Sequence, residues 1–368
     1  MTTRQDTWIF HKALAPIQAE AEVRGWQQVA GRLQVPALHS VTPSSNREHV
    51  LAYEDVFASG RCQHLLGDLI ASADRDPAAL PLVVALIDAV CDDLIGSAAS
   101  TGRTAALSDC VPALYLDRIR HAGRIDAWYL RPDLTIPGPG KGDKFPVREL
   151  RGFTLTLNGT EVPLDVPKAI RDARQALRPT SQWVSAITQG DPTEPNIAAS
   201  ATGACWLDFE HAGRNTLPGE IANLWWYLLA MGGWLVPTYQ PDTYARTLAL
   251  HLPPTAYPTL LQAQLSPQQR QLDLACTWTV GPGRHAALTR LHDRLTTDLG
   301  QAADLPPGRP LALLRPFLTT RILGVFPPSH FTDSDLLLLL AKLAEAQLVD
   351  GELFAHTQTP PDLTSPLE

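Results

Sequence analysis

The clearest hydrophobic pattern in the chain is helical and covers residues 77–97. Apolar side chains return there every three or four positions: Leu80, Val83, Val84, Ile87, Val90, Cys91, Leu94 and Ile95. This spacing places them on one face of an α-helix, so we expect a long, buried helix. Asp88, Asp92 and Asp93 lie mostly off that face, and we expect them to be solvated rather than catalytic.

In the N-terminal part, short apolar runs predict β-strands around one helix. Residues 7–14 (TWIFHKAL) are typical of a strand that carries Lys12, and the runs VPALHSV and HVLAYEDVF predict two more strands. Between the first and second strands, PIQAEAEVRGWQQVAGRL begins with proline at a permitted first helical position and is rich in good helix formers. We therefore expect a helix there, with Glu20 and Glu22 on it.

Residues 130–165 predict an insert that carries a hairpin. The run FTLTLNGTEVPLDV alternates, and Asn158-Gly159 stands between its two halves as a hairpin turn signal. The glycine-rich run PGPGKGDKF, at residues 137–145, lacks the spacing of a phosphate-binding loop and has no helix start after it. It is expected to lie at a hairpin tip.

Beyond residue 208 the pattern predicts a mostly helical part. EIANLWWYLLAMGGWLVPTY predicts an apolar helix that ends at the glycine pair 232–233. Further helices are expected for PDTYARTLALHL, SPQQRQLDLACTWTV, HAALTRLHDRLTTDL and DSDLLLLLAKLAEAQL. His251, His285 and His292 lack metal-ligand spacing and are expected to be surface or packing residues. The tail, residues 357–368, is polar and proline-rich and is expected to be disordered.

Composition and charge restrict the possible classes of function. The chain has 368 residues, 45% of them hydrophobic, and a net charge of −8, which is enough chain for two lobes and argues against a nucleic-acid-binding surface. An acidic surface suits a cationic substrate, although most acidic proteins are simply soluble. The five cysteines are scattered without a Cys-x-x-Cys pair, so neither a zinc site nor a disulfide framework is expected. The chain shows no signal-like start and no apolar run of about 18 residues, so we expect a cytoplasmic protein without membrane association.

The residues that carry chemistry lie between positions 187 and 220. Asp191, Asn196 five positions later, and Asp208 after a second apolar run stand in a mostly apolar frame. Phosphoryl transfer needs a carboxylate that orients and deprotonates a hydroxyl, and hard oxygen ligands for Mg²⁺. Asp191 is the candidate for the first role, and Asn196 and Asp208 are the candidates for the second. The alternative is that this stretch is two turns and a buried strand whose carboxylates have no role. In that case the match of three residue types at two separate spacings would be a coincidence.

The runs QGDPTEPN (189–196) and LDFE (207–210) resemble the aminoglycoside phosphotransferase family of small-molecule kinases. The family has His where this chain has Gln189, which is a supporting position, and usually Asp where this chain has Glu220. The resemblance implies an α+β, two-lobed protein-kinase-like fold. Its truncated N-terminal β lobe would be residues 1–58, and its mostly helical C-terminal lobe would be residues 59–356.

The resemblance also implies a nucleotide site for ATP and Mg²⁺. Lys12, positioned by Glu22 or alternatively by Glu20, would neutralise the phosphates, and Glu210 would help to hold the metal ion. The hinge would contact the adenine ring through backbone groups near Glu54 and Val56. The alternative for Lys12 and Glu22 is that both are solvated surface charges.

The sequence departs from kinases ahead of Lys12. Kinases place two strands and a glycine-rich loop there, whereas only eleven residues without glycine precede Lys12. We therefore expect no phosphate lid from this part of the chain. The nucleotide site is either unusually open or covered by another segment or by a partner protein.

The first functional hypothesis is transfer of the γ-phosphoryl group of ATP to a hydroxyl of a small natural product or antibiotic. The second is phosphorylation of Ser or Thr in a ribosomal precursor peptide, during natural-product maturation with a partner protein. The third is a non-catalytic pseudokinase scaffold, which has no physical need for Asp191, Asn196 and Asp208 together. The insert at residues 130–165 stands where family members build the acceptor site, although it could equally serve to stabilise the lobe.

Overall fold

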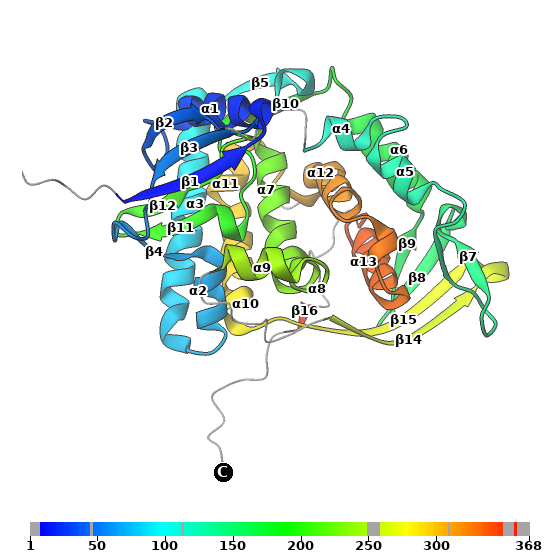
Figure 1. Cartoon of the computed structure of the whole chain (residues 1–368). Coiled ribbons are helices and arrows are strands. Elements are labelled where there is room, and N and C mark those ends of the chain that lie inside the picture. Colours follow the sequence, from blue (N-terminus) through cyan, green and yellow to red (C-terminus); the bar gives the residue numbers. More distant parts are fainter. Residues whose placement is uncertain are drawn as a thin grey trace, which may run out of the picture.

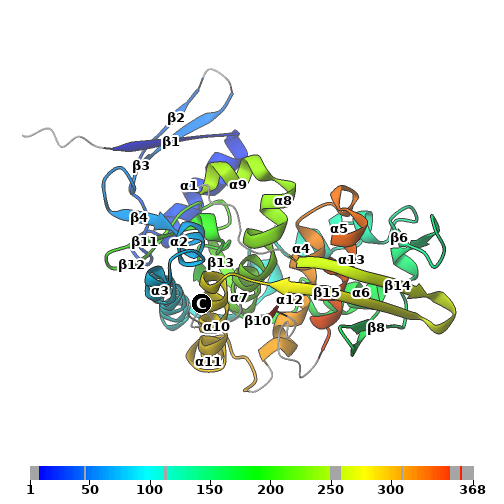
Figure 2. The same ribbon diagram turned by 90° about the horizontal axis from the view of Figure 1, so that it is seen from below.

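The computed structural model describes residues 8–44, 47–111, 114–248, 258–307, 310–348 and 357–358. The chain has a mixed α+β architecture, with a small N-terminal sheet and a larger, mostly helical part, as expected for the fold class. Figures 1 and 2 show the N-terminal sheet at one end of the molecule and the long β14–β15 hairpin at the other. None of the helices in the described ranges combines the length and apolar character that a membrane span requires.

The N-terminal sheet has the predicted order of elements. Its strands are β1 (Ile9–Leu14), β2 (Leu38–Pro43) and β3 (His49–Glu54), which pair antiparallel in the order β1-β3-β2. Helix α1 (Pro16–Val29) lies between β1 and β2 in the chain and packs against β1 and β3. The buried residues of α1 are Ala19, Glu22, Gly25 and Val29, which share one helix face. The carboxylate of Glu22 therefore lies on the face of α1 that packs against the rest of the protein.

The long predicted helix is α3 (Leu80–Thr101), and it follows β4 (Cys62–Leu65) and α2 (Leu66–Ala73). Its buried face includes Val83, Ile87, Val90, Cys91 and Leu94, all members of the predicted stripe. Helices α2 and α3 both pack against α10 (Pro282–Leu295), and α3 also packs against α11 (Asp298–Ala302).

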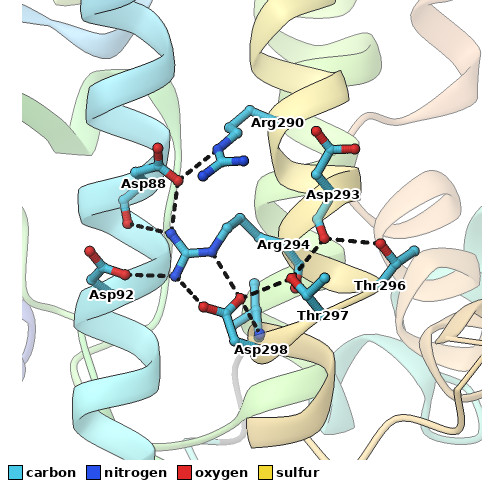
Figure 3. A network of polar contacts seen from close by, with 9 residues as sticks. Asp88, Asp92, Arg290, Asp293, Arg294, Thr296, Thr297 and Asp298 are labelled. Atoms are coloured by element: carbon cyan, nitrogen blue, oxygen red, sulfur yellow. Dashed lines mark hydrogen bonds and ion pairs between the residues drawn. The ribbon is translucent and has the colours of Figure 1, made fainter.

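The acidic residues of α3 are paired, which the sequence did not predict. Figure 3 shows Arg294 of α10 between Asp88 and Asp92 of α3 and Asp298 of α11, at 2.8, 2.6 and 2.8 Å. Arg290 contacts Asp88 at 2.7 Å. Because the guanidinium group offers five donors in a fixed plane, one arginine can join three carboxylates and so connect three helices.

Two small sheets present the motif residues. Strand β10 (Gln182–Thr188) pairs with β5 (Arg103–Ala106) and β13 (Gly213–Thr216), and it ends immediately before the run that begins at Gln189. Strand β12 (Gly203–Trp206) pairs with β11 (Ile197–Ser200), which also pairs with β4. The end of β12 leads directly into the LDFE run, so both motif segments follow buried strands.

The insert contains two hairpins. Strands β6 (Thr135–Pro137) and β7 (Lys144–Pro146) are joined by the glycine-rich loop, which lies at a hairpin tip as predicted. Strands β8 (Phe153–Leu157) and β9 (Thr160–Leu164) turn at Asn158-Gly159, also as predicted. The short helices α4 (Leu116–Ile119) and α5 (Arg124–Tyr129) precede these hairpins, and α6 (Val166–Ala176) follows them.

One predicted helix is wrong. The run SPQQRQLDLACTWTV forms strand β15 (Gln271–Thr279), which pairs antiparallel with β14 (Pro258–Ser266) and parallel with β8. Its buried residues alternate at Leu272, Leu274, Cys276 and Trp278, which is the period of a strand. The hairpin insert is thereby built into a larger sheet with the order β14-β15-β8-β9.

The apolar helix after residue 216 is longer than predicted. Helix α7 (Leu217–Trp226) continues through a π-helical stretch (Tyr227–Leu235) into α8 (Val236–Tyr239), and α9 (Pro241–Thr247) follows after a break at Gln240. The glycine pair does not end the helix. Instead, a Cβ atom at Gly232 would lie 2.2 Å from a carboxylate oxygen of Glu194, so the glycine provides room for that side chain.

The C-terminal helices are α12 (Pro310–Gly324) and α13 (Asp333–Glu345), and α13 coincides with the last predicted helix. In the tail, Thr357–Gln358 form the short strand β16, which pairs parallel with β15. The remaining tail residues, for which disorder was expected, lie outside the described residues, as does His251.

Candidate active site

A cavity of about 790 Å³ lies beside the N-terminal sheet and is lined by residues from both parts of the molecule. Its volume is within the range of pockets that hold cofactors and small molecules. All the predicted site residues except Glu210 line this cavity: Lys12, Glu22, Glu54, Val56, Asp191, Asn196 and Asp208. Segments far apart in the sequence therefore meet where the motif analysis expected a nucleotide and its acceptor.

Lys12 forms the centre of an ion-pair cluster. Its Nζ lies 3.0 Å from Glu22 Oε2 and 2.9 Å from Asp208 Oδ1. Glu22 is 1% exposed and also accepts hydrogen bonds from the Phe209 backbone N–H (3.0 Å) and the Tyr53 hydroxyl (3.2 Å). Glu20, the alternative partner, is exposed on the outer side of α1. Glu22 therefore connects the strand lysine, helix α1 and the LDFE segment.

The pKa shifts in this cluster follow from burial and mutual attraction. Burial alone would lower the pKa of Lys12, but Asp208 and Glu22 outweigh it and raise that pKa. Burial would raise the pKa of Asp208, and Lys12 reverses the shift, so the Asp208 pKa is lowered. Burial raises the pKa of Glu22 despite Lys12. A cationic lysine beside an ionised Asp208 is therefore favoured at neutral pH.

Asp191 is held by amide side chains from two directions. Asn223 of α7 donates its side-chain N–H to Asp191 Oδ1 at 2.7 Å. Asn196 donates to the Asp191 carbonyl oxygen at 3.0 Å and to Oδ2 at 3.4 Å. The Asp191 side chain remains 26% exposed, so a substrate can reach its carboxylate. The five-residue spacing of Asp191 and Asn196 does bring the two residues together.

The backbone just before Asp191 requires glycine. Gly190 has φ +92°, and a Cβ atom there would lie 2.0 Å from the His211 carbonyl oxygen. L-residues rarely adopt this conformation, and no side chain fits the space. Asp208 has φ 59° although it is not glycine. A strained backbone at a residue that points into a cavity is typical of a functional position.

Gln189 stands at the position that the resemblance assigns to His. Its side-chain N–H group donates to the carbonyl oxygens of Leu207 (2.9 Å) and Asp208, and its Oε1 accepts from the Asp191 N–H (2.9 Å). One buried amide therefore joins the segment that carries Asp191 to the segment that carries Asp208. This arrangement accounts for the tolerance of glutamine here, because the position requires a hydrogen-bonding side chain and not a titrating one.

Glu220 lies beneath the same loop. It is 2% exposed, and its Oε2 accepts a hydrogen bond from the Gly190 N–H at 3.2 Å. Burial raises the pKa of Glu220 to about 8. The carboxyl group is therefore largely protonated at neutral pH and acts as an uncharged support for the loop.

Several residues of the site were not singled out from the sequence. Glu194, 2% exposed, forms a buried ion pair with Arg284 of α10, and Arg284 also donates to the Leu228 carbonyl oxygen at 2.8 Å. Arg118 and Arg321 line the cavity near Asp191, and Arg321 Nη2 lies 3.7 Å from Asp191 Oδ1. These partners come from helices distant in the sequence, and no local spacing marks them.

The hinge and metal predictions have mixed outcomes. Val56 and Glu54 line the cavity, but the Glu54 carboxylate is bound to Arg61 at 2.6 Å and the Glu54 backbone N–H donates to the Ala37 carbonyl oxygen at 2.8 Å, so neither group is free to contact an adenine ring. Glu210 lies 3.3 Å from His211 Nε2 and is not among the residues that line the cavity.

Within the part of the chain that the structure describes, His, Cys, Asp and Glu side chains do not by themselves form a metal site. No group of three or more His, Cys, Asp or Glu side chains in the described ranges could hold a metal ion. The pair of hard oxygen donors from Asn196 and Asp208 does fit Mg²⁺, because this ion is usually held by one or two protein ligands together with phosphate oxygens and water.

The open side of the cavity is bordered by β1. In the described part of the chain β1 is an edge strand, paired only with β3. Trp8, Ile9 and Phe10 are 55, 43 and 54% exposed, and Phe10 lines the cavity. In the described chain, β1 therefore presents apolar side chains at a strand edge beside the cavity.

Comparison with known proteins found no matching family model and no matching curated protein. The solved structures to which the chain is similar are aminoglycoside phosphotransferases and small-molecule kinases. An amicoumacin kinase, solved with AMP-PNP and Ca²⁺, matches over 93% of this chain and 82% of its own, with 10% identity and a TM-score of 0.43. A glucosamine kinase matches over 90% and 70%, with 14% identity and a TM-score of 0.43. An aminoglycoside-3'-phosphotransferase of type VIII matches over 84% of both chains, with 14% identity and a TM-score of 0.38.

Proposed function

We propose that the protein is an ATP- and Mg²⁺-dependent phosphotransferase that phosphorylates a hydroxyl group of a small molecule, such as a natural product or antibiotic. The observation that carries the proposal is the meeting of two clusters in one cavity. The first is Lys12 with Glu22 and Asp208, and the second is Asp191 with Asn196. Together they supply the cation, the metal ligands and the base that phosphoryl transfer requires.

The reaction assigns each group a role. The acceptor oxygen forms a bond to the γ-phosphorus, the bond from that phosphorus to the β–γ bridging oxygen breaks, and ADP leaves with its electron pair. Asp191 orients the hydroxyl and receives its proton, while Asn223 holds the carboxylate in place. Lys12 attracts the phosphates. Catalysis is then mainly positioning and electrostatic stabilisation.

Asn196 and Asp208 would hold Mg²⁺, which neutralises charge on the phosphate oxygens. The Asn196 amide nitrogen is occupied by Asp191, which leaves its oxygen as the ligand atom. Asp208 is held by Lys12 in the described structure. A bound nucleotide would give that lysine a new anionic partner and free the carboxylate for the ion.

Replacement of Asp191 by Asn tests the proposal. The variant keeps the shape of the side chain but cannot accept the proton, so we expect turnover to fall by about 100-fold or more. Binding of Mg²⁺·AMP-PNP should be retained. Turnover is measured with labelled ATP against a collection of hydroxyl compounds and peptides. Glu161→Gln, at an exposed position of β9, is the matched control. Full activity of the Asp191 variant would refute the assignment of the base.

One observation favours the second candidate, a peptide acceptor presented with a partner protein. The exposed apolar residues at the edge of β1 offer a surface that another chain would cover, next to the open side of the cavity. Titration of AMP-PNP with and without candidate partners tests this. Tight nucleotide binding that no partner changes would count against it.

A further inference from the structure

Two arginines line the cavity close to Asp191 without the partners that buried guanidinium groups normally have. Arg118 comes from α4 and Arg321 from α12, and these helices pack against each other. In both side chains Nε and Nη1 are buried and have no hydrogen-bond partner among the described residues. Arg321 is 4% exposed. Buried donors left unpaired cost free energy, so such a pair is expected to have a ligand.

Nearby carboxylates do not satisfy these groups. Arg321 Nη2 lies 3.7 Å from Asp191 Oδ1, which is too far for a hydrogen bond, and that oxygen already accepts from Asn223 at 2.7 Å. Burial, followed by the charges of Arg321 and Arg124, lowers the pKa of Arg118 to about 9. The two guanidinium groups therefore repel each other in the free protein, and an anion between them would remove that repulsion.

The surrounding structure holds Arg118 in position without any anion. A Cβ atom at Gly324 of α12 would lie 3.1 Å from Arg118 Cδ, so this glycine makes room for the arginine stem. Arg124 of α5 donates to the Gly324 carbonyl oxygen at 3.1 Å and lies over the Trp128 ring. The pair is thus prearranged by three helices and is not a chance meeting of flexible surface chains.

The position of Arg118 and Arg321 in the cavity indicates which reactant of the proposed phosphoryl transfer they would bind. Lys12 and Asp208 would supply the phosphate side of the cavity. Burial would raise the pKa of Asp208, but Lys12, a hydrogen bond with Glu22 and His211 together lower it. Arg118 and Arg321 instead act together with Asp191. They come from α4 and α12, on the side of the molecule away from β1 (Figure 1). Because Asp191 would hold the acceptor hydroxyl, the arginines would contact the acceptor.

We propose that the acceptor carries an anionic group, a carboxylate or a phosphate, close to the hydroxyl that is phosphorylated, and that Arg118 and Arg321 bind it. This inference rests on the proposed phosphotransferase function and specifies its substrate class. The planar guanidinium fork matches both anions in a bidentate manner. A cationic acceptor, which the overall charge of the chain would suit, is disfavoured at this position.

Four matched polyols test the proposal directly on the unaltered protein: gluconate, glucose 6-phosphate, glucose and glucosamine. Each is titrated by calorimetry in the presence of saturating Mg²⁺·AMP-PNP, so that the nucleotide phosphate site is filled. We expect at least one anionic probe to bind roughly tenfold or more tightly than glucose, because a hydrogen bond between charged groups contributes about that much to affinity. The gluconate and glucose 6-phosphate arms distinguish a carboxylate from a phosphate. Equal binding of the four, tighter binding of glucosamine, or no binding of either anion overturns the proposal.

Variants test whether Arg118 and Arg321 cause the preference for anionic probes. Arg321→Gln and Arg118→Gln should each remove most of the preference for the anion, while Arg321→Lys should keep part of it because the charge remains. Arg120→Gln, an exposed position next to α4, is the control and should behave like the unaltered protein. Thermal unfolding confirms that each variant is folded. An unchanged preference in folded Arg321→Gln and Arg118→Gln overturns the assignment.

The same samples separate this inference from the proposed function. Preferential anion binding without any binding of Mg²⁺·AMP-PNP would refute phosphotransfer and leave the anion site standing. Turnover of neutral or cationic acceptors that is insensitive to Arg321→Gln would refute the anion site and leave phosphotransfer standing. Loss of AMP-PNP affinity in both arginine variants, with no change in anion preference, would place the arginines on the nucleotide phosphates and overturn the inference.

Discussion

Two amide side chains, Gln189 and Asn223, support the segments that carry Asp191 and Asp208 in the candidate site. Gln189 joins the backbone of Asp208 to the backbone of Asp191, and Asn223 binds the Asp191 carboxylate directly. Neither amide titrates, so the geometry they impose is the same at any pH at which the protein is folded. At the residue scale, the site depends on these uncharged supports as much as on its charged members.

Replacing Gln189 with Ala removes a donor to two carbonyl oxygens and an acceptor for the Asp191 N–H. The two segments should lose their common support, and we expect kcat to fall by about tenfold or more, the equivalent of one or two buried hydrogen bonds. The dissociation constant of Mg²⁺·AMP-PNP should change much less. Single-turnover kinetics and calorimetry measure the two quantities. Gln262→Ala, at an exposed position of β14, is the control. Unchanged kcat in the Gln189 variant would contradict the role.

Glu220 predicts a pH dependence of stability. Burial raises its pKa from 4.5 to about 8, so the folded state binds its proton more tightly than the unfolded state does. The stability that Glu220 contributes is therefore full below about pH 4.5 and is lost as the pH rises to about 8. Relative to Glu220→Gln, the unaltered protein should lose up to about 1.4 kcal/mol of unfolding free energy per pH unit in this window. Denaturant titrations at several pH values measure the difference. A difference that is flat from pH 5 to 8 would contradict this.

At the scale of elements, the loop that follows Asp191 is joined to helix α10. Glu194, three positions after Asp191, forms a bidentate, buried ion pair with Arg284, and the arginine also binds the π-helical stretch through the Leu228 carbonyl oxygen. Gly232 leaves the space that the carboxylate occupies. The loop supplies Glu194, α10 supplies Arg284, and the π-helical stretch supplies the Leu228 carbonyl oxygen. These three segments therefore have to be assembled together for the buried polar contacts to form.

Breaking this pair on one side should destabilise the fold strongly. We expect Glu194→Gln, and separately Arg284→Met, each to lower the unfolding free energy by about 3–5 kcal/mol, because a buried charge is left without its partner. The double variant should cost less than the sum of the two. Urea denaturation gives all three values. Lys168→Met, which breaks an exposed pair with Asp172, is the control and should cost less than about 1 kcal/mol. Additive losses in the double variant would show that the two residues do not act as a unit.

At the scale of the whole molecule, the cavity joins the N-terminal sheet to the helical part. Lys12 and Glu22 come from the sheet side, Asp208 and Asp191 from the other, and the Lys12–Asp208 ion pair crosses between them. A nucleotide in the cavity would contact both sides. Its binding free energy should therefore stabilise the assembled molecule and not one part alone.

Nucleotide binding should raise the unfolding temperature. At a concentration of about 100 times its dissociation constant, Mg²⁺·AMP-PNP is expected to add about 2.7 kcal/mol to the unfolding free energy. Lys12→Met should lose most of this gain because it removes the phosphate cation, whereas Lys168→Met should keep it. Differential scanning calorimetry with and without ligand measures the shift. The absence of a shift in the unaltered protein, or an equal shift in Lys12→Met, would contradict a nucleotide site at Lys12.

Local sequence was informative where partners are close along the chain. Asp191 and Asn196 lie in one loop, and Lys12 and Glu22 lie on a strand and the helix that follows it, so spacing and motif place each pair together. Asn223, Arg284 and Arg321 were missed because their contacts with the loop depend on how helices pack. Strand β15 was predicted as a helix because its apolar run is short enough to fit either period, and only pairing with β8 and β14 selects the strand.

The chain by itself determined which residues are candidates for the chemistry, because Asp191 and Asn196 stand five positions apart in one loop and meet there. It also determined the small N-terminal sheet and the long helix α3, because the spacing of apolar residues that predicts each of them can be seen in consecutive residues of the sequence. Tertiary structure alone decided how those groups are supported and which side of the cavity holds Arg118 and Arg321, whose Nε and Nη1 atoms have no hydrogen-bond partner among the described residues. It also decided that Glu220 is buried, which raises the pKa of its carboxyl group. The physical reason is that burial and long-range contact are properties of the packed chain, whereas periodicity and loop spacing are properties of neighbouring residues.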